Sequence, residues 1–200
     1  MDMSEQKNAY AFLVGAAKCG TTTLANLLDR HPQVCLSTPK ETDYFTDAGQ
    51  KQGAGWYEKC FSRSTPDQLR LDASVSYSAG WGGDSKNIAK RLFDFSPNAK
   101  IIYVVRDPVQ RTWSAYWHAV RNGYENRSFS EAMKDRQVDH ITASQYVDRL
   151  DDYLSFFSKQ QILIVDFKRL SIEPQRLLDE VTDFLGVNGF ELPEEALERK

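Results

Sequence analysis

A lysine lies within the first glycine-bearing loop of the chain, beside a run of threonines that opens a helical pattern. The loop, residues 15–22 (GAAKCGTT), follows an apolar run at residues 10–14 and precedes leucines spaced three and four apart. Backbone N–H groups at the start of a helix, together with the helix dipole, favour a bound anion. Glycines let the main chain approach that anion, and Lys18 adds a positive charge. The loop therefore predicts a phosphate site; an ordinary strand, turn and helix with a stray lysine is the alternative.

The spacing of this loop differs from that of the nucleoside triphosphate loop, G-x-x-x-x-G-K-[ST]. Gly15 and Gly20 have the correct separation, but Thr21 occupies the lysine position and the lysine stands earlier, at Lys18. We therefore expect a phosphate loop that is a poor Walker motif.

A second pair of anion-binding side chains follows the most apolar strand pattern of the chain, residues 101–105 (IIYVV). Arg106 comes directly after it, and Asp107 and Pro108 are typical of a helix cap and first turn. Ser114 then lies two helical turns beyond the cap, about 10 Å along the axis. An arginine and a hydroxyl facing one pocket suit a second phosphate, held by charge-assisted hydrogen bonds. Alternatively, Arg106 is a structural ion-pair partner and Ser114 lies on the helix surface.

The composition indicates one globular domain. The 200 residues carry 25 basic and 28 acidic side chains, a net charge of −3, so a general nucleic-acid binder is not expected. No apolar run is long enough to span a membrane, and the polar start does not resemble a signal peptide. Cys19, Cys35 and Cys60 lack metal-like spacing and are expected to be free thiols in a reducing compartment. We therefore expect a cytoplasmic protein.

Strand and helix patterns alternate along the chain. This order predicts an α/β fold, a P-loop-like three-layer sandwich with a central parallel sheet of about five strands. We expect strands at residues 10–14, 34–36, 69–73, 101–105 and 162–165, and helices at residues 22–30, 84–95, 108–121, 144–158 and 174–185. Residues 46–68 are expected to be irregular, and Trp113, Trp117 and Val120 are expected to mark the inner face of their helix. Ligands in such folds lie beyond the carboxyl ends of the strands, which places Lys18, Ser74 and Arg106 along one edge.

Two segments together resemble the sulfotransferases that use 3′-phosphoadenosine 5′-phosphosulfate (PAPS), most closely the heparan sulfate type. They are residues 12–22 (FLVGAAKCGTT) and residues 105–116 (VRDPVQRTWSAY), in the same order and at a matching separation. The similarity runs from about Tyr10 to Gly186. It implies a PAPS-dependent enzyme that sulfates a hydroxyl or amine, with a glycan among the possible acceptors.

The resemblance also implies roles for individual residues. The 5′-phosphosulfate would be bound by Lys18, Cys19, Gly20, Thr21 and Thr22, and the 3′-phosphate by Arg106 and Ser114. Lys18 would further stabilise charge on the leaving phosphate oxygen, an electrostatic contribution that needs no metal.

Sulfuryl transfer to a hydroxyl also needs a proton acceptor. Residues 40–45 (KETDYF) resemble the family segment whose glutamate is the catalytic base, which makes Glu41 the expected base. A solvated loop charge is the alternative for Glu41, and His31, His118 and His140 are weaker candidates.

The sequence departs from the glycan-modifying relatives in two residues and in its end. Ala73 replaces a lysine found in some of them, and Asp43 stands where several have histidine.

We expect residues 1–9 to be a flexible tail, residues 10–188 the sulfotransferase domain, and residues 189–200 an acidic tail truncated before a closing segment. Two other functions remain open from sequence: a P-loop kinase for a small molecule, and a nucleotide-binding module without catalysis. The acceptor and the oligomeric state are not specified.

Overall fold

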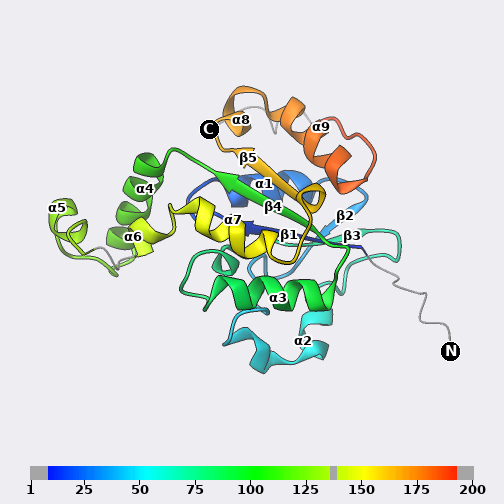
Figure 1. The fold of residues 1–200 in the computed structure, drawn as a ribbon. Helices are drawn as coiled ribbons and strands as arrows, with labels where there is room; N and C mark the ends of the chain where they lie inside the picture. Colours follow the sequence, from blue (N-terminus) through cyan, green and yellow to red (C-terminus); the bar gives the residue numbers. More distant parts are fainter. Residues whose placement is uncertain (1–8, 136–138, 193–200) are drawn as a thin grey trace.

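The centre of the fold is a parallel sheet, present in a computed structural model that describes residues 9–135 and 139–192 (Figure 1). Five strands pair in the order β2-β3-β1-β4-β5, and every pairing is parallel. Their bounds are β1 Tyr10–Gly15, β2 Val34–Leu36, β3 Leu69–Asp72, β4 Lys100–Val105 and β5 Ile162–Asp166. The expected α/β class and five-stranded sheet are confirmed.

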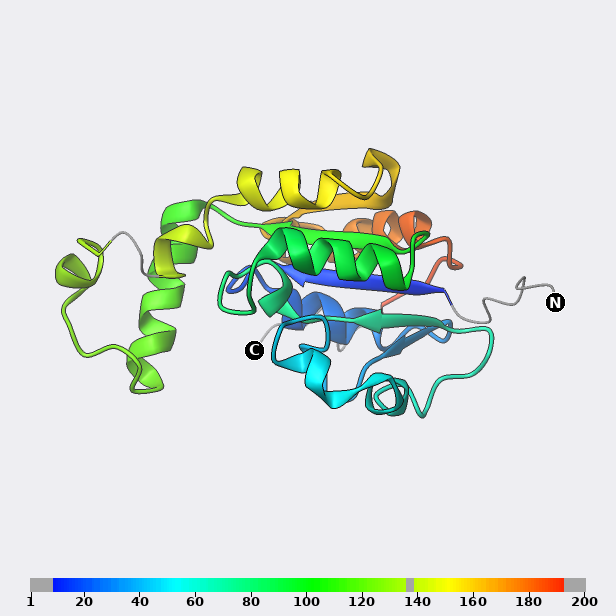
Figure 2. The same ribbon diagram turned by 60° about the horizontal axis from the view of Figure 1, so that its bottom comes forward.

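Helices cover both faces of the sheet and form the two outer layers (Figures 1 and 2). The helix pair α3 and α7 packs together on one face, and α1 and α9 lie on the other. The helices are α1 Thr21–Leu28, α2 Ala54–Lys59, α3 Ser85–Phe95, α4 Pro108–Arg121, α5 Phe129–Ala132, α6 Asp139–Thr142, α7 Tyr146–Leu154, α8 Arg169–Ile172 and α9 Pro174–Leu185. Three 3₁₀ turns are η1 Gly49–Gln52, η2 Val75–Tyr77 and η3 Lys159–Gln161.

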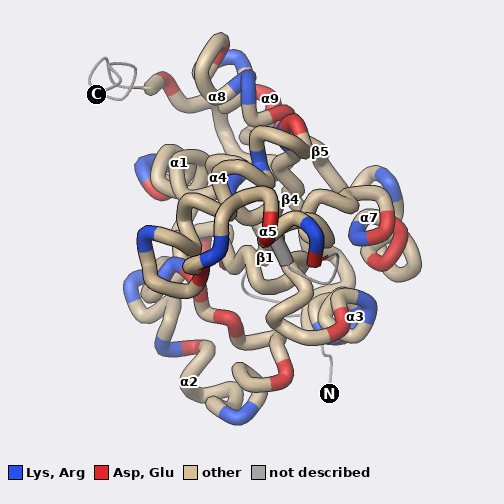
Figure 3. The backbone as a smooth tube through the Cα atoms, turned by 90° about the vertical axis from the view of Figure 1, so that its left-hand side faces the viewer, with Lys and Arg blue, Asp and Glu red and all other residues tan. Residues whose placement is uncertain are grey.

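The strand order explains why distant parts of the sequence meet. Because β3, β1 and β4 are neighbours and run in parallel, the loops that follow them share one edge of the sheet. Helix α4 stands at this carboxyl edge with α5 and α6, on the left of Figure 1. Figure 3 views the molecule from that side, with the basic and acidic positions marked along the backbone.

The central strands β1 and β4 are buried over most of their length, whereas β5, one of the two edge strands, is partly exposed. β1 is buried at all six positions and β4 from Ile101 to Val104, as expected of strands covered on both faces. Residues 162–165 form a strand as expected, but the interpretation of this apolar run as a buried strand was wrong in part, because β5 is an edge strand and Ile164 is 49% exposed.

Helix ends follow their capping residues. Asp107 accepts a hydrogen bond from the N–H of Gln110 and Pro108 opens α4, as predicted. Gly186 ends α9 in the left-handed conformation at φ 73°, which glycine adopts without steric cost.

Residues 46–68 were expected to be irregular, and this prediction was wrong. They contain η1 and α2. The six-residue α2 has no side-chain cap and is too short for a clear periodic pattern, so tertiary packing specifies it. Its Tyr57 is buried against the rings of Tyr44, Phe45 and Phe61.

The prediction of the inner face of α4 was also wrong. Trp113 and Trp117 are 48% and 40% exposed, while Arg111, Tyr116 and Ala119 are the buried residues of this helix. Since α4 extends from the edge of the sheet, the large indoles line a surface cavity and a charged residue faces inward. The hydrophobic pattern alone therefore misassigned the face.

Within the described residues, no helix is both long enough and apolar enough to cross a membrane. The three cysteines are free and buried. The proposed tails fall largely on residues 1–8 and 193–200, which lie outside the described residues, as does the side chain of His140.

Candidate active site

The loop between β1 and α1 is shaped by two glycines that neighbouring side chains approach closely. A Cβ on Gly15 would lie 2.1 Å from the Ser78 hydroxyl oxygen, and one on Gly20 would lie 2.8 Å from the Phe167 ring. Gly20 also has a φ of +80°, in the left-handed region. The two glycines thus allow the loop to turn tightly from the sheet into α1.

The start of α1 leaves donors available for an anion. Gly20 is the N-cap and offers no side-chain cap, and the hydroxyl-bearing Thr22 and Thr23 are exposed in the first turn. The first N–H groups of a helix have no partner within the helix. This geometry matches the phosphate loop that the sequence predicts.

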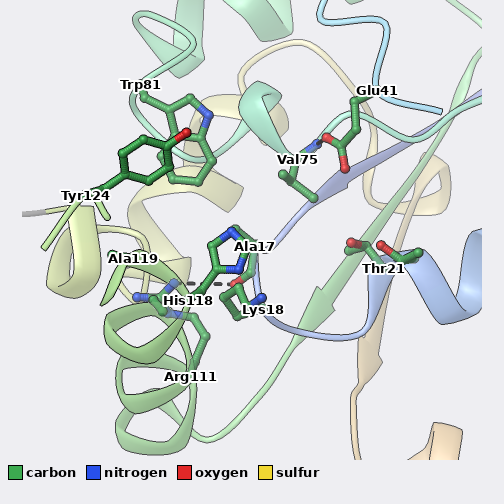
Figure 4. A pocket seen from close by; sticks show the side chains of 12 residues that line it. Ala17, Lys18, Thr21, Glu41, Val75, Trp81, Arg111, His118, Ala119 and Tyr124 are labelled. Atoms are coloured by element: carbon green, nitrogen blue, oxygen red, sulfur yellow. Dashed lines mark hydrogen bonds between the residues drawn. The ribbon is translucent and has the colours of Figure 1, made fainter. Parts of the chain in front are cut away.

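Lys18 lies in this loop, half-buried and with a left-handed φ of 70°. It lines a cavity of about 430 Å³ together with Thr21, Thr22 and Glu41 (Figure 4). Burial, and then the charges of Arg121 and Arg106, lower the pKa of the Lys18 ammonium from its ordinary value. An anion in the cavity would offset this repulsion between like charges.

Cys19 is placed differently from its neighbours in the loop. Its side chain is fully buried, with the thiol near the Ala17 carbonyl and the Tyr146 hydroxyl, and its N–H donates to the carbonyl of Ala16 at 3.1 Å. Cys19 therefore supports the turn, and neither its side chain nor its N–H is free for a phosphate.

Arg106 follows β4 and reaches the same loop. Its Nη1 donates a hydrogen bond to the carbonyl oxygen of Lys18 at 3.3 Å, and its guanidinium lies 4.5 Å from the centre of the Phe167 ring. Its Nε is buried and has no hydrogen-bond partner among the described residues. A buried polar group of this kind is costly unless something binds it, which is consistent with a ligand site.

A second cavity, of about 440 Å³, brings Arg106 and Ser114 together as the sequence predicts. Trp113, Trp117 and Arg121 also line it. Lys18, Arg106 and Arg121 make no ion pair with a carboxylate in the described part of the chain, so positive charge accumulates here. Two basic cavities are thus joined through the contact between Arg106 and the Lys18 loop.

Glu41 faces the first cavity from the side opposite Lys18 (Figure 4). Its Oε1 accepts a hydrogen bond from Lys40 Nζ at 2.6 Å, and its Oε2 accepts one from the N–H of Val75 at 2.9 Å. Lys40 also donates to the carbonyl of Ala73. Both carboxylate oxygens are therefore held in place while the group remains partly accessible to solvent.

A buried carboxylate supports the segment that carries Glu41. Asp72, at the end of β3, accepts hydrogen bonds from the hydroxyls of Thr42, Tyr57, Ser74 and Tyr77. Ser74 Oγ in turn accepts the N–H groups of Thr42 and Asp43. Burial raises the pKa of Asp72 to about 6, against the opposing effect of these hydrogen bonds.

Arg111 is a buried residue of α4 that supports the loop. It is buried, donates from Nε to the Ser144 hydroxyl at 2.5 Å, and donates from Nη1 to the Ala17 carbonyl at 3.4 Å. Arg111 thus ties α4 and the α6–α7 connection to the phosphate loop.

Comparison with known proteins agrees with this geometry. Residues 9–199 match the family model described as the sulfotransferase domain. The chain belongs to the sulfotransferase domain family. The resemblance derived from the two motifs is therefore confirmed.

Curated relatives of this sulfotransferase domain include enzymes named for heparan sulfate. Mouse bifunctional heparan sulfate N-deacetylase/N-sulfotransferase 4 is 31% identical over 193 residues, which cover 88% of this chain and 22% of that protein. Mouse heparan sulfate glucosamine 3-O-sulfotransferase 3A1 is 28% identical over 195 residues, covering 94% of this chain and 48% of that protein. The chain spans less than half the length of either relative.

Solved sulfotransferase structures share the fold. The sulfotransferase from Alicyclobacillus acidocaldarius superposes with a TM-score of 0.82 at 26% identity, covering 96% of this chain and 86% of that one. Mouse sulfotransferase SULT7A1, solved in complex with PAP, gives a TM-score of 0.59 at 16% identity, covering 96% and 62%. The second likeness concerns the fold alone.

Three residues of this sulfotransferase site were missed or undervalued by sequence reasoning. Arg121 lies seven residues after Ser114, a spacing that places both on one helix face and would have identified it. His118 lines the Lys18 cavity, and burial with the charges of Lys18 and Arg121 lowers the pKa of its imidazole. Asp72 carries no local signal, because its four partners come together only in the fold.

Proposed function

We propose that this chain transfers a sulfuryl group from PAPS to a hydroxyl or amine acceptor. The observation that carries the proposal is the hydrogen bond from Arg106 to the carbonyl of Lys18, which joins two basic cavities. PAPS has anionic groups at two ends of one adenosine, and two adjoining basic cavities suit such a ligand. The PAP complex of a protein with the same fold supports this choice.

In this proposal the phosphate loop holds the 5′-phosphosulfate. The free N–H groups of Gly20, Thr21 and Thr22 and the ammonium of Lys18 bind its oxygens. Arg106 and Ser114 bind the 3′-phosphate, and Arg121 adds charge in the same cavity. Cys19 keeps a supporting place in the turn.

The proposed reaction is an in-line displacement at sulfur. The acceptor oxygen or nitrogen forms a bond to sulfur while the bond from sulfur to the 5′-phosphate oxygen breaks. Lys18 stabilises the charge that develops on that leaving oxygen, a contribution typically of about 3 kcal/mol. Glu41 takes the proton of the acceptor, because its carboxylate lies across the same cavity from Lys18.

His118 is the competing proton acceptor, since it lines the same cavity and its lowered pKa keeps the imidazole neutral near pH 7. Glu41 is favoured because two hydrogen bonds orient its carboxylate. The variants Glu41→Gln and His118→Gln distinguish the two candidates. We expect kcat to fall in the variant that lacks the true proton acceptor, while its PAP affinity stays near that of the wild type.

Calorimetric titration with PAP tests the donor assignment. We expect Lys18→Ala and Arg106→Ala each to weaken PAP binding by at least about tenfold, because each removes a charge-assisted contact. Lys90→Ala, a surface lysine on α3 paired with Asp94, is the matched control and keeps wild-type affinity. Unchanged affinity in both site variants contradicts the proposal.

A further inference from the structure

The cavity that contains Lys18 continues past Glu41 into another hollow. Glu41 and Trp81 line both, whereas Lys18 lines only the first. We call the second hollow, of about 380 Å³, the acceptor cavity and define it by Glu41, Asp43, Thr46, Trp56, Ser76 and Trp81. A molecule in the acceptor cavity would meet Glu41 at the junction with the donor site.

The ionisable groups of the acceptor cavity are acidic. Glu41 and Asp43 line it, and no lysine, arginine or histidine does so among the described residues. Asp43 is exposed, and its Oδ1 accepts a hydrogen bond from the Ser76 hydroxyl at 2.5 Å, which fixes the carboxylate. This fixed carboxylate repels an anionic acceptor and attracts a cationic one.

Two basic side chains near the acceptor cavity, Lys40 and Arg91, are already engaged. Lys40 is bonded to Glu41 and to the Ala73 carbonyl. Arg91 is bonded to Asp47 at 2.6 Å and to the carbonyl of Phe45 at 2.9 Å. An anionic acceptor would have to compete with these contacts to reach Lys40 or Arg91.

Two indoles supply the apolar part of the acceptor cavity. Trp56 and Trp81 both line it, and Trp81 is 54% exposed at the point where the two cavities meet. A large aromatic side chain left open in a cavity provides a flat surface on which a ring of the ligand can pack.

We propose that the acceptor is a small alcohol or phenol that carries a ring and a cationic group and no anionic group. The ring packs on Trp81, the cation pairs with Asp43, and the hydroxyl reaches Glu41. In the reaction the hydroxyl oxygen forms the new bond to sulfur, the bond from sulfur to the 5′-phosphate breaks, and the proton passes to Glu41. This acceptor class rests on the proposed sulfuryl transfer and differs from the anionic glycans named for the relatives.

A series of phenols that differ only in side-chain charge tests the proposal. Tyramine, tyrosol and 3-(4-hydroxyphenyl)propionate present an ammonium, a hydroxyl and a carboxylate on the same phenol. Each is titrated into the 200-residue chain saturated with PAP, so that binding is measured without turnover. We expect tyramine to bind at least about tenfold tighter than the propionate, with tyrosol between them.

Two substitutions separate charge from packing. Asp43→Asn should reduce the tyramine-to-propionate preference by about threefold or more, since it removes the fixed charge. Trp81→Ala should weaken tyramine and tyrosol equally and leave that preference unchanged. Asp67→Asn, an exposed carboxylate in the loop before β3 at the opposite edge of the sheet, is the charge-matched control and should change neither.

The outcomes distinguish the acceptor class from the enzyme activity. Failure of PAP to bind is read before any phenol is added and overturns sulfuryl transfer itself. Intact PAP binding with no measurable binding of tyramine, or with tighter binding of the propionate or of N-deacetylated heparosan, overturns the acceptor class alone. A preference for tyramine that survives Asp43→Asn also overturns it, because the charge would then act from elsewhere.

Discussion

The guanidinium of Arg106 is hydrogen-bonded to the main-chain carbonyl of Lys18, across 3.3 Å, although 88 residues separate the two in sequence. The backbone of the phosphate loop therefore connects the two cations that we assign to the two ends of the donor. A change at either residue alters the environment of the other, because Arg106 also contributes to the lowered pKa of Lys18.

This contact predicts that charge alone does not restore an Arg106 variant. Arg106→Lys keeps a cation but loses the planar donor that spans the Lys18 carbonyl and the Phe167 ring. We expect its PAP affinity to stay at least about fivefold below that of the wild type. In calorimetry, a double-mutant cycle of Arg106→Ala with Lys18→Ala should be non-additive by more than about 0.5 kcal/mol. Strict additivity would mean that the two cations bind independently.

The Glu41 carboxylate predicts a loss of rate without a loss of donor binding. Glu41→Gln keeps the shape of the side chain but removes the proposed proton acceptor, so kcat should fall by about 100-fold or more. PAP affinity should stay within about twofold of wild type, because the proposed role of Glu41 is toward the acceptor and not toward the donor. Rates come from mass spectrometry of the sulfated product, and a near-normal kcat would assign the proton transfer to another group, His118 first.

The placement of the two proposed anion-binding residues, Lys18 and Arg106, was predictable from sequence because each motif is local and follows a strand. The chain order of strand, loop and helix places Lys18 and Arg106 at the carboxyl edge of one parallel sheet. Glu41 was reached only through the resemblance to a family segment, since a lone carboxylate in a loop has no distinctive pattern.

The remaining parts of the site depend on contacts that form only in the folded chain. Asp72 collects hydroxyls from four separate positions, and no spacing connects them. The face of α4 was misassigned because the pattern counts Trp113 as a core residue, whereas Arg111 is the one buried in the loop contact. Hydrophobic periodicity describes helices packed on a sheet better than a helix that stands at its edge.

The raised pKa of Asp72 predicts a pH dependence of stability. The folded protein holds this proton up to about pH 6, whereas the ordinary pKa is 3.8, so the folded state binds more protons between these values. The free energy of unfolding therefore falls as pH rises through this interval, by up to about 3 kcal/mol for this group.

Urea unfolding at several pH values measures the contribution of Asp72 to the free energy of unfolding, as the difference between the wild type and Asp72→Asn. Asp72→Asn cannot titrate, so its stability should lack the decline that the wild type and Asp67→Asn share. Parallel curves for the wild type and Asp72→Asn between about pH 4 and about pH 6 would show that Asp72 titrates normally.

The lowered pKa of Lys18 predicts that PAP affinity begins to fall at a lower pH than it would with an ordinary lysine. In the proposed site Lys18 binds phosphate as the ammonium, so affinity should fall as pH rises through its pKa in the free protein, below the ordinary 10.5. Arg121→Gln removes a like charge and should move this loss to higher pH, while also weakening binding overall. Lys18→Arg should show no loss up to about pH 10. PAP titrations across this range measure all three, and a wild-type affinity that is flat with pH contradicts the role of the ammonium.

The tight approach of Phe167 to Gly20 predicts that the loop tolerates no side chain there. Gly20→Ala places a Cβ 2.8 Å from the Phe167 ring at a left-handed φ of +80°, so both a clash and backbone strain arise. We expect a loss of about 2 kcal/mol or more in the free energy of unfolding and a weaker PAP site, because the first turn of α1 shifts. Gly186→Ala is the matched control: its φ of 73° and ψ of 28° lie close to the 80° and 19° of Gly20, but nothing lies within 4 Å of the new Cβ, so it carries the strain without the clash. Urea unfolding and PAP titration of both variants isolate the clash, and equal effects in the two would assign the requirement for Gly20 to its backbone conformation alone.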